Sequence, residues 1–134
     1  MYIVSGCLAG LCCRYDGGDN ADERVMKLVS EGKAIPVCPE QLGGLTTPRP
    51  PCEIVEGRVL SNQGEDVTEQ FRRGAEEALK LAKLADSRKA ILKARSPSCG
   101  IGKIYDGTFG GNLIDGDGLF ADMLRKEGFE LETE

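Results

Sequence analysis

The alternation of short apolar runs with helical patterns constrains the fold of this chain more than any other feature. Apolar runs of β-type residues lie at 2–5, 34–38 and 89–93. Apolar residues at helical spacing predict helices near 22–31, 67–85 and 119–126. Strands that alternate with helices form parallel sheets joined by right-handed crossovers. We therefore expect an α/β fold with a small, mostly parallel sheet.

The segment 67–85 carries the clearest helical pattern, because its apolar and charged residues fall on opposite faces. The helix near 22–31 is expected to begin at a cap provided by Asp19 or Asn20. A short last strand is expected over 129–131. The chain has 134 residues, which is the length of one compact domain, so we treat residues 1–134 as a single domain.

Glycine and proline mark the loops that separate these elements. A Pro- and Gly-rich loop spans 40–51, and a second Gly-rich stretch spans 105–118. A small hairpin is expected over 54–61, with its turn at Glu56–Gly57. Ligand sites of parallel sheets lie beyond the carboxyl ends of the strands. The loops that follow the apolar runs are therefore the expected place for a functional site.

The sequence contains no histidine, which excludes Ser-His-Asp and Cys-His catalytic groups and zinc sites that use imidazole. The net charge is −5, so no excess of basic residues is present to bind nucleic acid or an anionic membrane. No 18-residue apolar run could span a bilayer. We expect no nucleic-acid or membrane partner.

The first residues do not resemble a signal peptide, so we expect a cytoplasmic protein. The oligomeric state stays open.

Cysteines are the main candidates for chemistry. The six are Cys7, Cys12, Cys13, Cys38, Cys52 and Cys99. Three of them, Cys7, Cys38 and Cys99, stand where an apolar run gives way to a loop rich in Gly or Pro. Because the carboxyl ends of parallel strands meet at one edge, these three thiols are expected to converge there. Cys13 lies in the same loop as Cys7 and could reach the same place.

The spacing of the cysteines excludes several common sites. No two of them form a C-x-x-C pair, so a zinc knuckle, a thioredoxin-type motif and a ferredoxin run are absent. In a reducing compartment, a cysteine set of this kind serves metal binding or catalysis more often than disulfides. A cysteine can also be a small apolar core residue, and we favour that interpretation for Cys12 and Cys52.

Three longer motifs contain these cysteines. The first is Ser5-Gly6-Cys7-Leu8-Ala9-Gly10 followed by Cys13-Arg14-Tyr15-Asp16-Gly17. The second is Pro36-Val37-Cys38-Pro39-Glu40 with Gly43-Gly44-Leu45 and Pro48-Arg49. The third is Arg95-Ser96-Pro97-Ser98-Cys99-Gly100 followed by Ile104-Tyr105-Asp106-Gly107-Thr108-Phe109. Together they resemble a bacterial family, long labelled as of unknown function, that includes 2-thiouracil desulfidases. The chain departs from the family at Ala9, where leucine is usual, and at Cys12, which is an additional thiol.

The resemblance implies a Rossmann-like three-layer domain with long loops at the carboxyl edge of the sheet. It also implies a 4Fe-4S cluster that is held by three cysteines and leaves one iron open. Carried over to this chain, the cluster ligands, and so the metal ligands, are Cys7, Cys38 and Cys99. Cys13 also matches a family position and is the alternative to Cys7.

The resemblance further implies catalytic roles for Glu40 and for one serine of the Ser96-Pro97-Ser98 turn. We favour Ser98 because it adjoins Cys99, and Ser96 is the alternative. Without histidine, a carboxylate is the natural acid or base, and Glu40 follows closely after Cys38.

The expected reaction is the non-redox removal of sulfur, as sulfide, from a thiolated pyrimidine such as 2-thiouracil. Thiolates are the usual ligands of iron–sulfur clusters. An open, thiophilic iron can bind the thiocarbonyl sulfur and polarise the carbon–sulfur bond for attack by water. The carbon keeps its oxidation level, so no electron donor is needed.

Two other functions would use the same cysteines. A non-catalytic metal or iron–sulfur module that senses iron or redox state would use four protein ligands, Cys13 included, and would not need Glu40. A metal-free thiol enzyme would rely on one cysteine of low pKa. Arg14, Arg49 and Arg95 are candidates to offset the negative charge of a cluster and its thiolates.

Overall fold

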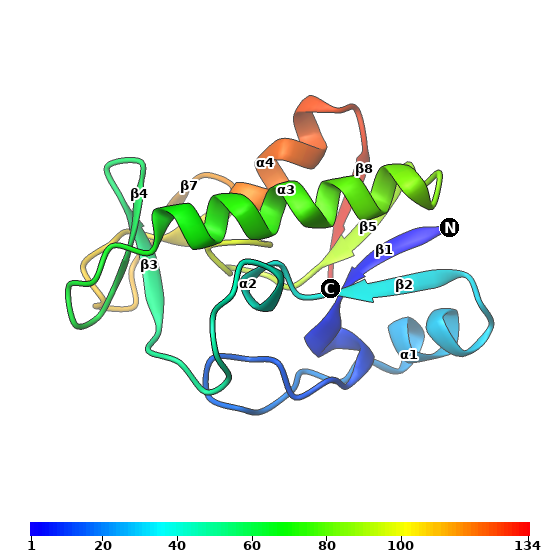
Figure 1. Cartoon of the computed structure of the whole chain (residues 1–134), viewed down its shortest axis with the longest axis horizontal. Helices are drawn as coiled ribbons and strands as arrows, with labels where there is room; N and C mark the ends of the chain where they lie inside the picture. Colours follow the sequence, from blue (N-terminus) through cyan, green and yellow to red (C-terminus); the bar gives the residue numbers. More distant parts are fainter.

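A four-stranded sheet forms the centre of the computed structural model, which describes residues 1–134 (Figure 1). Its strands are β1 (Tyr2–Ser5), β2 (Ala34–Val37), β5 (Lys89–Leu92) and β8 (Glu130–Thr133). The strand order is β2-β1-β5-β8, and each neighbouring pair is parallel. The expected α/β fold with a small, mostly parallel sheet is confirmed.

Helices cover both faces of this sheet. Successive residues of a strand point to opposite faces. Ile3 therefore packs with α3 (Thr68–Leu84) and α4 (Leu119–Lys126), whereas Val4 packs with α1 (Glu23–Ser30). The result is the three-layer, Rossmann-like arrangement that the motifs imply.

The start of α1 differs from the sequence prediction. The side chain of Asp22 caps this helix and accepts a hydrogen bond from the backbone N–H of Val25 at 3.1 Å. Asp19 instead accepts from the backbone N–H of Ala21 at 2.7 Å, within the preceding turn. A capping side chain must stand directly before the first helical turn to reach its free N–H groups, and only Asp22 does so.

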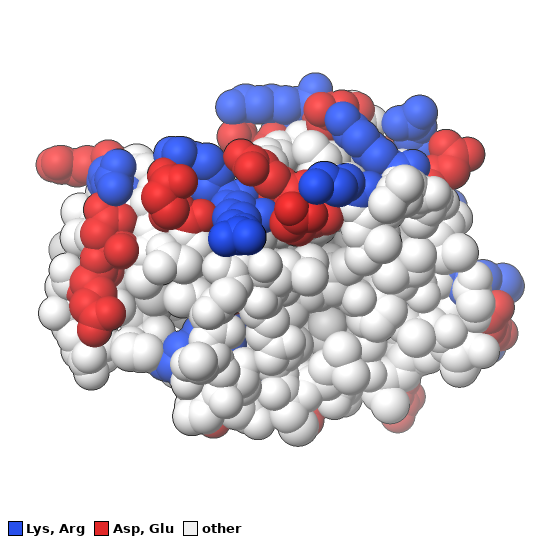
Figure 2. Space-filling model, in the orientation of Figure 1, with Lys and Arg blue, Asp and Glu red and all other residues white.

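The long helix α3 buries one face and exposes the other. Figure 2 shows basic and acidic side chains side by side over α3 and α4, while the lower part of the same view carries few charges. On the opposite side of α3, Ala75, Ala78 and Ala82 are fully buried. Their small side chains let the helix lie close to the sheet. The bounds of α3 agree with the predicted segment to within one residue at each end.

The chain makes two excursions away from the main sheet. After β2 come the helical turn α2 (Pro39–Leu42) and the hairpin of β3 (Cys52–Val55) and β4 (Arg58–Ser61). After β5 comes a second hairpin, β6 (Lys103–Tyr105) and β7 (Leu113–Asp115). The first hairpin was expected. By contrast, most of α2 and all of β7 fall in segments that were predicted to be loops, and β6 was not predicted.

No helix combines the length and the apolar content that crossing a membrane requires.

Candidate functional site

A cavity of about 450 Å³ lies where the chain leaves the carboxyl ends of the parallel strands. Segments that follow β1, β2 and β5 line it, together with the start of β3. Five of the six cysteines are among the lining residues, namely Cys7, Cys13, Cys38, Cys52 and Cys99. Cys12 is exposed and lies outside the lining. The topology therefore gathers thiols that are far apart in the sequence.

Cys7 and Cys99 are both buried beside this cavity. Cys7 lies in η1 (Gly6–Ala9), directly after β1, and burial is the main cause that raises its pKa. Burial likewise raises the pKa of Cys99, and negative charge on Cys7 or Cys38 would raise it further. The three thiols are thus close enough to influence one another, and in the protein alone burial favours the neutral forms of Cys7 and Cys99.

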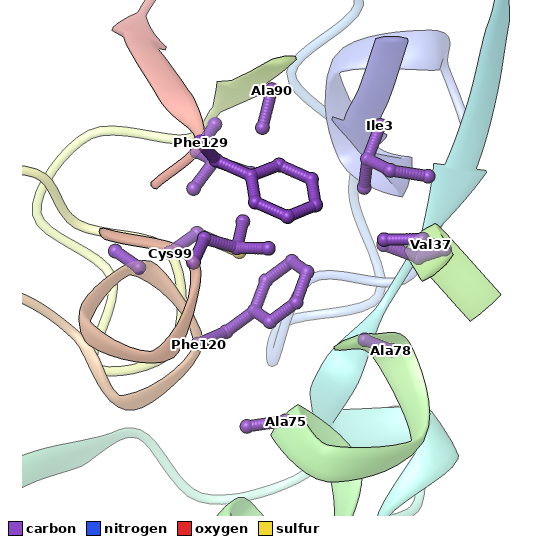
Figure 3. Packing of buried hydrophobic residues seen from close by; sticks show 12 residues of the cluster. Ile3, Val37, Ala75, Ala78, Ala90, Cys99, Phe120 and Phe129 are labelled. Carbon is purple, nitrogen blue, oxygen red and sulfur yellow. The ribbon is translucent and has the colours of Figure 1, made fainter. Parts of the chain in front are cut away.

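Cys99 stands at the border between the cavity and the core. Figure 3 places it among the core side chains, near Phe120 and Phe129. Its exposed fraction is only 5%. The hydroxyl of Ser96 accepts hydrogen bonds from the backbone N–H groups of Ser98 and Cys99, both at 3.0 Å. These two hydrogen bonds fix the backbone of the turn and, with it, the position of Cys99 in the loop after β5.

Cys38 has a more polar environment. A hydrogen bond from the Cys13 thiol lowers the pKa of Cys38 to about 7, although burial acts in the opposite direction. The backbone N–H of Gln41, in α2, lowers the pKa further. The same thiol contact, together with burial, raises the pKa of Cys13. Of these two neighbouring thiols, Cys38 is the one that ionises more readily.

The helical turn α2 is held in place by close backbone contact with α3. A side chain on Gly43 would overlap the carbonyl oxygen of Gln70, and one on Gly74 would overlap the carbonyl oxygen of Pro39. Because neither position has room for a Cβ atom, only glycine permits this approach. The contact sets the position of Pro39, and with it the residues on either side, Cys38 and Glu40.

Glu40 is bound through both of its carboxylate oxygens. Oε1 accepts a hydrogen bond from Nε of Arg49 at 3.0 Å, and Oε2 accepts one from the hydroxyl of Ser98 at 3.2 Å. The Arg49 and Glu40 side chains are only 6% and 15% exposed. Glu40 and Ser96 line the cavity, whereas Ser98 is buried behind it. The structure thus joins Ser98 to Glu40 and leaves Ser96 facing the open space.

Cys52 lines the cavity although the sequence favoured a core role for it. Its thiol lies 3.5 Å from the carbonyl oxygen of Pro50. Burial raises its pKa to about 11, with a smaller contribution from the charge of Glu40. The one sequence signal for this position was its place directly after Pro50-Pro51, at the end of the long loop.

The spacing of the acidic and thiol side chains bears on what the cavity could hold. No group of three Cys, Asp or Glu side chains is arranged to bind one metal ion. In an iron–sulfur cluster each cysteine ligates a different iron, so the thiolates stand farther apart than the ligands of a single ion. The chemistry of the donor set, which is sulfur without imidazole, also suits such a cluster. The residues present therefore fit a cluster better than a single-ion site.

Proteins of one α/β class hold a small ligand or an inorganic group at the carboxyl edge of the sheet. The three-layer fold of this chain, with thiols and a carboxylate around one cavity, places it in that class. The sequence profile of the 2-thiouracil desulfurase family matches residues 2–134. This chain belongs to that family, which confirms the resemblance seen in its motifs.

Two similar proteins extend this comparison. The chain is 44% identical to the uncharacterized protein YbbK of Bacillus subtilis (strain 168), over 100% of this chain and 95% of that one. The structure of the 4Fe-4S-dependent thiouracil desulfidase TudS is similar with a TM-score of 0.94 and 44% identity. That match covers 99% of this chain and 89% of TudS.

Proposed function

We propose that this protein is an iron–sulfur-dependent desulfidase that removes sulfur, as sulfide, from a thiocarbonyl substrate such as 2-thiouracil. Its family and its similarity to TudS support this activity. The observation that carries the proposal is the convergence of Cys7, Cys38, Cys99 and Glu40 on one cavity. We further propose that residues 1–134 act as one domain in the cytoplasm, where thiols stay reduced.

Cys7, Cys38 and Cys99 would hold a 4Fe-4S cluster, and Cys13 is the alternative to Cys7. When bound, a cluster with one iron free of protein ligands would supply a thiophilic Lewis acid for the sulfur of the substrate. Burial keeps Cys7 and Cys99 protonated in the protein alone, so binding the cluster would release protons.

Glu40 is the proposed proton carrier. The overall reaction converts a thiocarbonyl and water into a carbonyl and hydrogen sulfide, without any change in the oxidation level of the carbon. Glu40 would accept a proton from the attacking water and return it to the departing sulfur. Its two oxygens are already oriented by Arg49 and Ser98, so little reorganisation is needed when substrate binds.

The two serines would have different roles. Ser98 donates to Glu40 and does not line the cavity, so it would act through Glu40. Ser96 lines the cavity, and its hydroxyl already accepts two backbone hydrogen bonds. Its own proton would therefore be free to donate to the substrate. Ser96 is the serine that we propose to contact the substrate.

The proposal is tested by purifying the protein without oxygen and analysing its iron, its sulfide and its visible spectrum. We expect a brown protein that releases sulfide and uracil from 2-thiouracil with no added reductant. The variant Glu40→Gln should keep the iron but lose turnover. A wild-type protein that is loaded with iron and sulfide but leaves 2-thiouracil intact would contradict the proposed activity.

The position of Cys13 supports a second candidate function. Its thiol bonds to Cys38 and lines the same cavity, so a fourth protein ligand is at hand. A cluster with four cysteine ligands and no turnover would identify a module that senses iron or redox state. Loss of iron on replacing Cys13, together with unchanged behaviour on replacing Glu40, would favour that function.

A further inference from the structure

The Arg49 side chain is buried in the wall of the cavity, and each of its three nitrogens donates at least one hydrogen bond. Its guanidinium donates to Oε1 of Glu40 at 3.0 Å and to the carbonyl oxygen of Cys13 at 2.8 Å. It also donates to the hydroxyl of Thr47 at 2.9 Å and to the carbonyl oxygen of Thr46 at 3.2 Å. A planar guanidinium presents its donors at fixed angles, so these bonds fix the positions of their acceptors relative to one another.

The acceptors come from segments that the sequence separates. Glu40 belongs to α2, whereas Cys13 belongs to the loop that follows η1. The backbone N–H of Arg49 adds a further bond to this loop, to the carbonyl oxygen of Tyr15 at 2.8 Å. The carbonyl oxygen of Cys13 also accepts from the thiol of Cys38, at 3.8 Å. One side chain therefore connects the carboxylate of the site with the backbone that surrounds its thiols.

Four cations line the cavity, namely Arg14, Arg49, Lys93 and Arg95, and only Arg49 forms an ion pair with Glu40. Arg14 is bound to Asp16 and Asn20, and Lys93 is paired with Glu134. The ion pair of Glu40 is with Arg49. Without Arg49, Glu40 would keep only its bond to the neutral hydroxyl of Ser98, and its carboxylate could rotate away from the cavity.

We propose that Arg49 is a positioning residue, which holds the Glu40 carboxylate toward the cavity and in register with the loop that carries Cys13. The inference rests on the proposed function, in which Glu40 moves the proton during sulfur removal. Arg49 does not need to touch the substrate to act in this way, because four of its five side-chain N–H donors are already bonded within the protein.

The test compares Arg49→Met, Arg49→Lys and the control Arg72→Met in the cluster-loaded protein. We expect Arg49→Met to lower kcat about a hundredfold, the usual effect of misplacing a reacting group, while KM, iron content and visible spectrum change little. Arg49→Lys should recover about a tenth of the wild-type kcat, since an ammonium can contact Glu40 but cannot also bond the Cys13 carbonyl with fixed geometry. Arg72 pairs with Glu69 on the exposed face of α3, so its replacement should have no effect.

A second comparison separates positioning from a general structural role. In single-turnover experiments, Arg49→Met should change the residual rate of Glu40→Gln by less than about twofold, because the group through which Arg49 acts is already lost. An equal loss in both backgrounds would overturn the inference, as would a wild-type kcat in Arg49→Met.

If Arg49→Met fails to fold or to keep iron, Arg49→Lys decides. A loaded Lys variant with lowered kcat and unchanged KM supports the inference, and one with wild-type kcat overturns it. A wild-type protein that releases no sulfide would instead contradict the proposed function.

Discussion

The hydroxyl of Ser98 donates a hydrogen bond to Oε2 of Glu40 at 3.2 Å, across 58 positions of the sequence. Ser98 is only 1% exposed, whereas Glu40 lines the cavity. The bond joins the loop after β5 to α2 and leaves the carboxylate fixed between Ser98 and Arg49. A buried neutral group thus orients the charged group that we propose to carry the proton.

Replacing Ser98 with alanine should lower kcat by about tenfold, because a hydrogen bond to a charged group contributes about 1.5–3 kcal/mol. Iron content should stay unchanged, since the hydroxyl bonds to the carboxylate and to no thiol. Steady-state kinetics with 2-thiouracil and iron analysis provide the measurement. Ser30→Ala is the matched control, because the Ser30 hydroxyl bonds only to the carbonyl oxygen of Lys27 on the exposed surface. An unaltered kcat in Ser98→Ala would show that this bond does not orient Glu40 for catalysis.

The three proposed ligands should each be essential for holding iron. Replacing Cys7, Cys38 or Cys99 with serine should remove most of the iron and sulfide, because a hydroxyl is a poor ligand for this iron chemistry. Cys12→Ser should keep a full complement, since Cys12 is exposed and outside the cavity lining. The measurement is iron and sulfide per chain after anaerobic purification.

Cys13 distinguishes between the two ligand sets. If Cys7, Cys38 and Cys99 hold the cluster, Cys13→Ser should retain iron and most of the activity. Retention of iron in Cys7→Ser, combined with its loss in Cys13→Ser, would instead assign Cys13 as the ligand from this loop.

Cys52 should contribute to the cavity wall without holding iron. Its pKa of about 11 lies above the ordinary value for a thiol, so the group keeps its proton throughout the neutral range. We expect Cys52→Ala to bind a full complement of iron, with an effect on KM rather than on kcat. Iron analysis and kinetics on the same preparation test this expectation, and loss of iron would place Cys52 among the ligands.

Periodicity and strand topology were enough to predict the central part of the fold. The apolar runs became β1, β2 and β5, and the parallel pairing of these strands brings Cys7, Cys38 and Cys99 to one cavity. These features depend on local patterns and on the general rule for parallel sheets. They could therefore be inferred from one sequence.

The elements that the sequence did not reveal are those that tertiary contacts stabilise. The turn α2 has only four residues and owes its position to α3. The bond between Arg49 and Glu40 depends on the path of the Pro-rich loop between them, which no periodic pattern describes. That Ser96 lines the cavity while Ser98 is buried and bonds to Glu40 likewise depends on tertiary contacts and on hydrogen bonds within a tight turn.

Because α2 contacts α3 closely, we predict that replacing a glycine of α3 with alanine destabilises the protein, although helix propensity alone would predict a stabilisation. Gly74 lies inside α3, where alanine normally stabilises a helix by about 0.5–1 kcal/mol relative to glycine. A Cβ atom at this position would overlap the carbonyl oxygen of Pro39, and inserting a group into a packed contact costs about 1–3 kcal/mol. Gly74→Ala should therefore destabilise the protein in denaturant unfolding.

Gly74→Ala should also disturb the functional site, because Pro39, which contacts Gly74, stands between Cys38 and Glu40 in the sequence. Moving α2 away from α3 would displace both side chains, so iron content and kcat should fall together in Gly74→Ala. Gly110→Ala is the control, since a Cβ there would meet only the ends of the Thr108 and Asn112 side chains, at 3.3 and 3.4 Å. A Gly74→Ala protein that is more stable than the wild type and fully active would show that backbone contact with α3 does not set the geometry of Cys38 and Glu40.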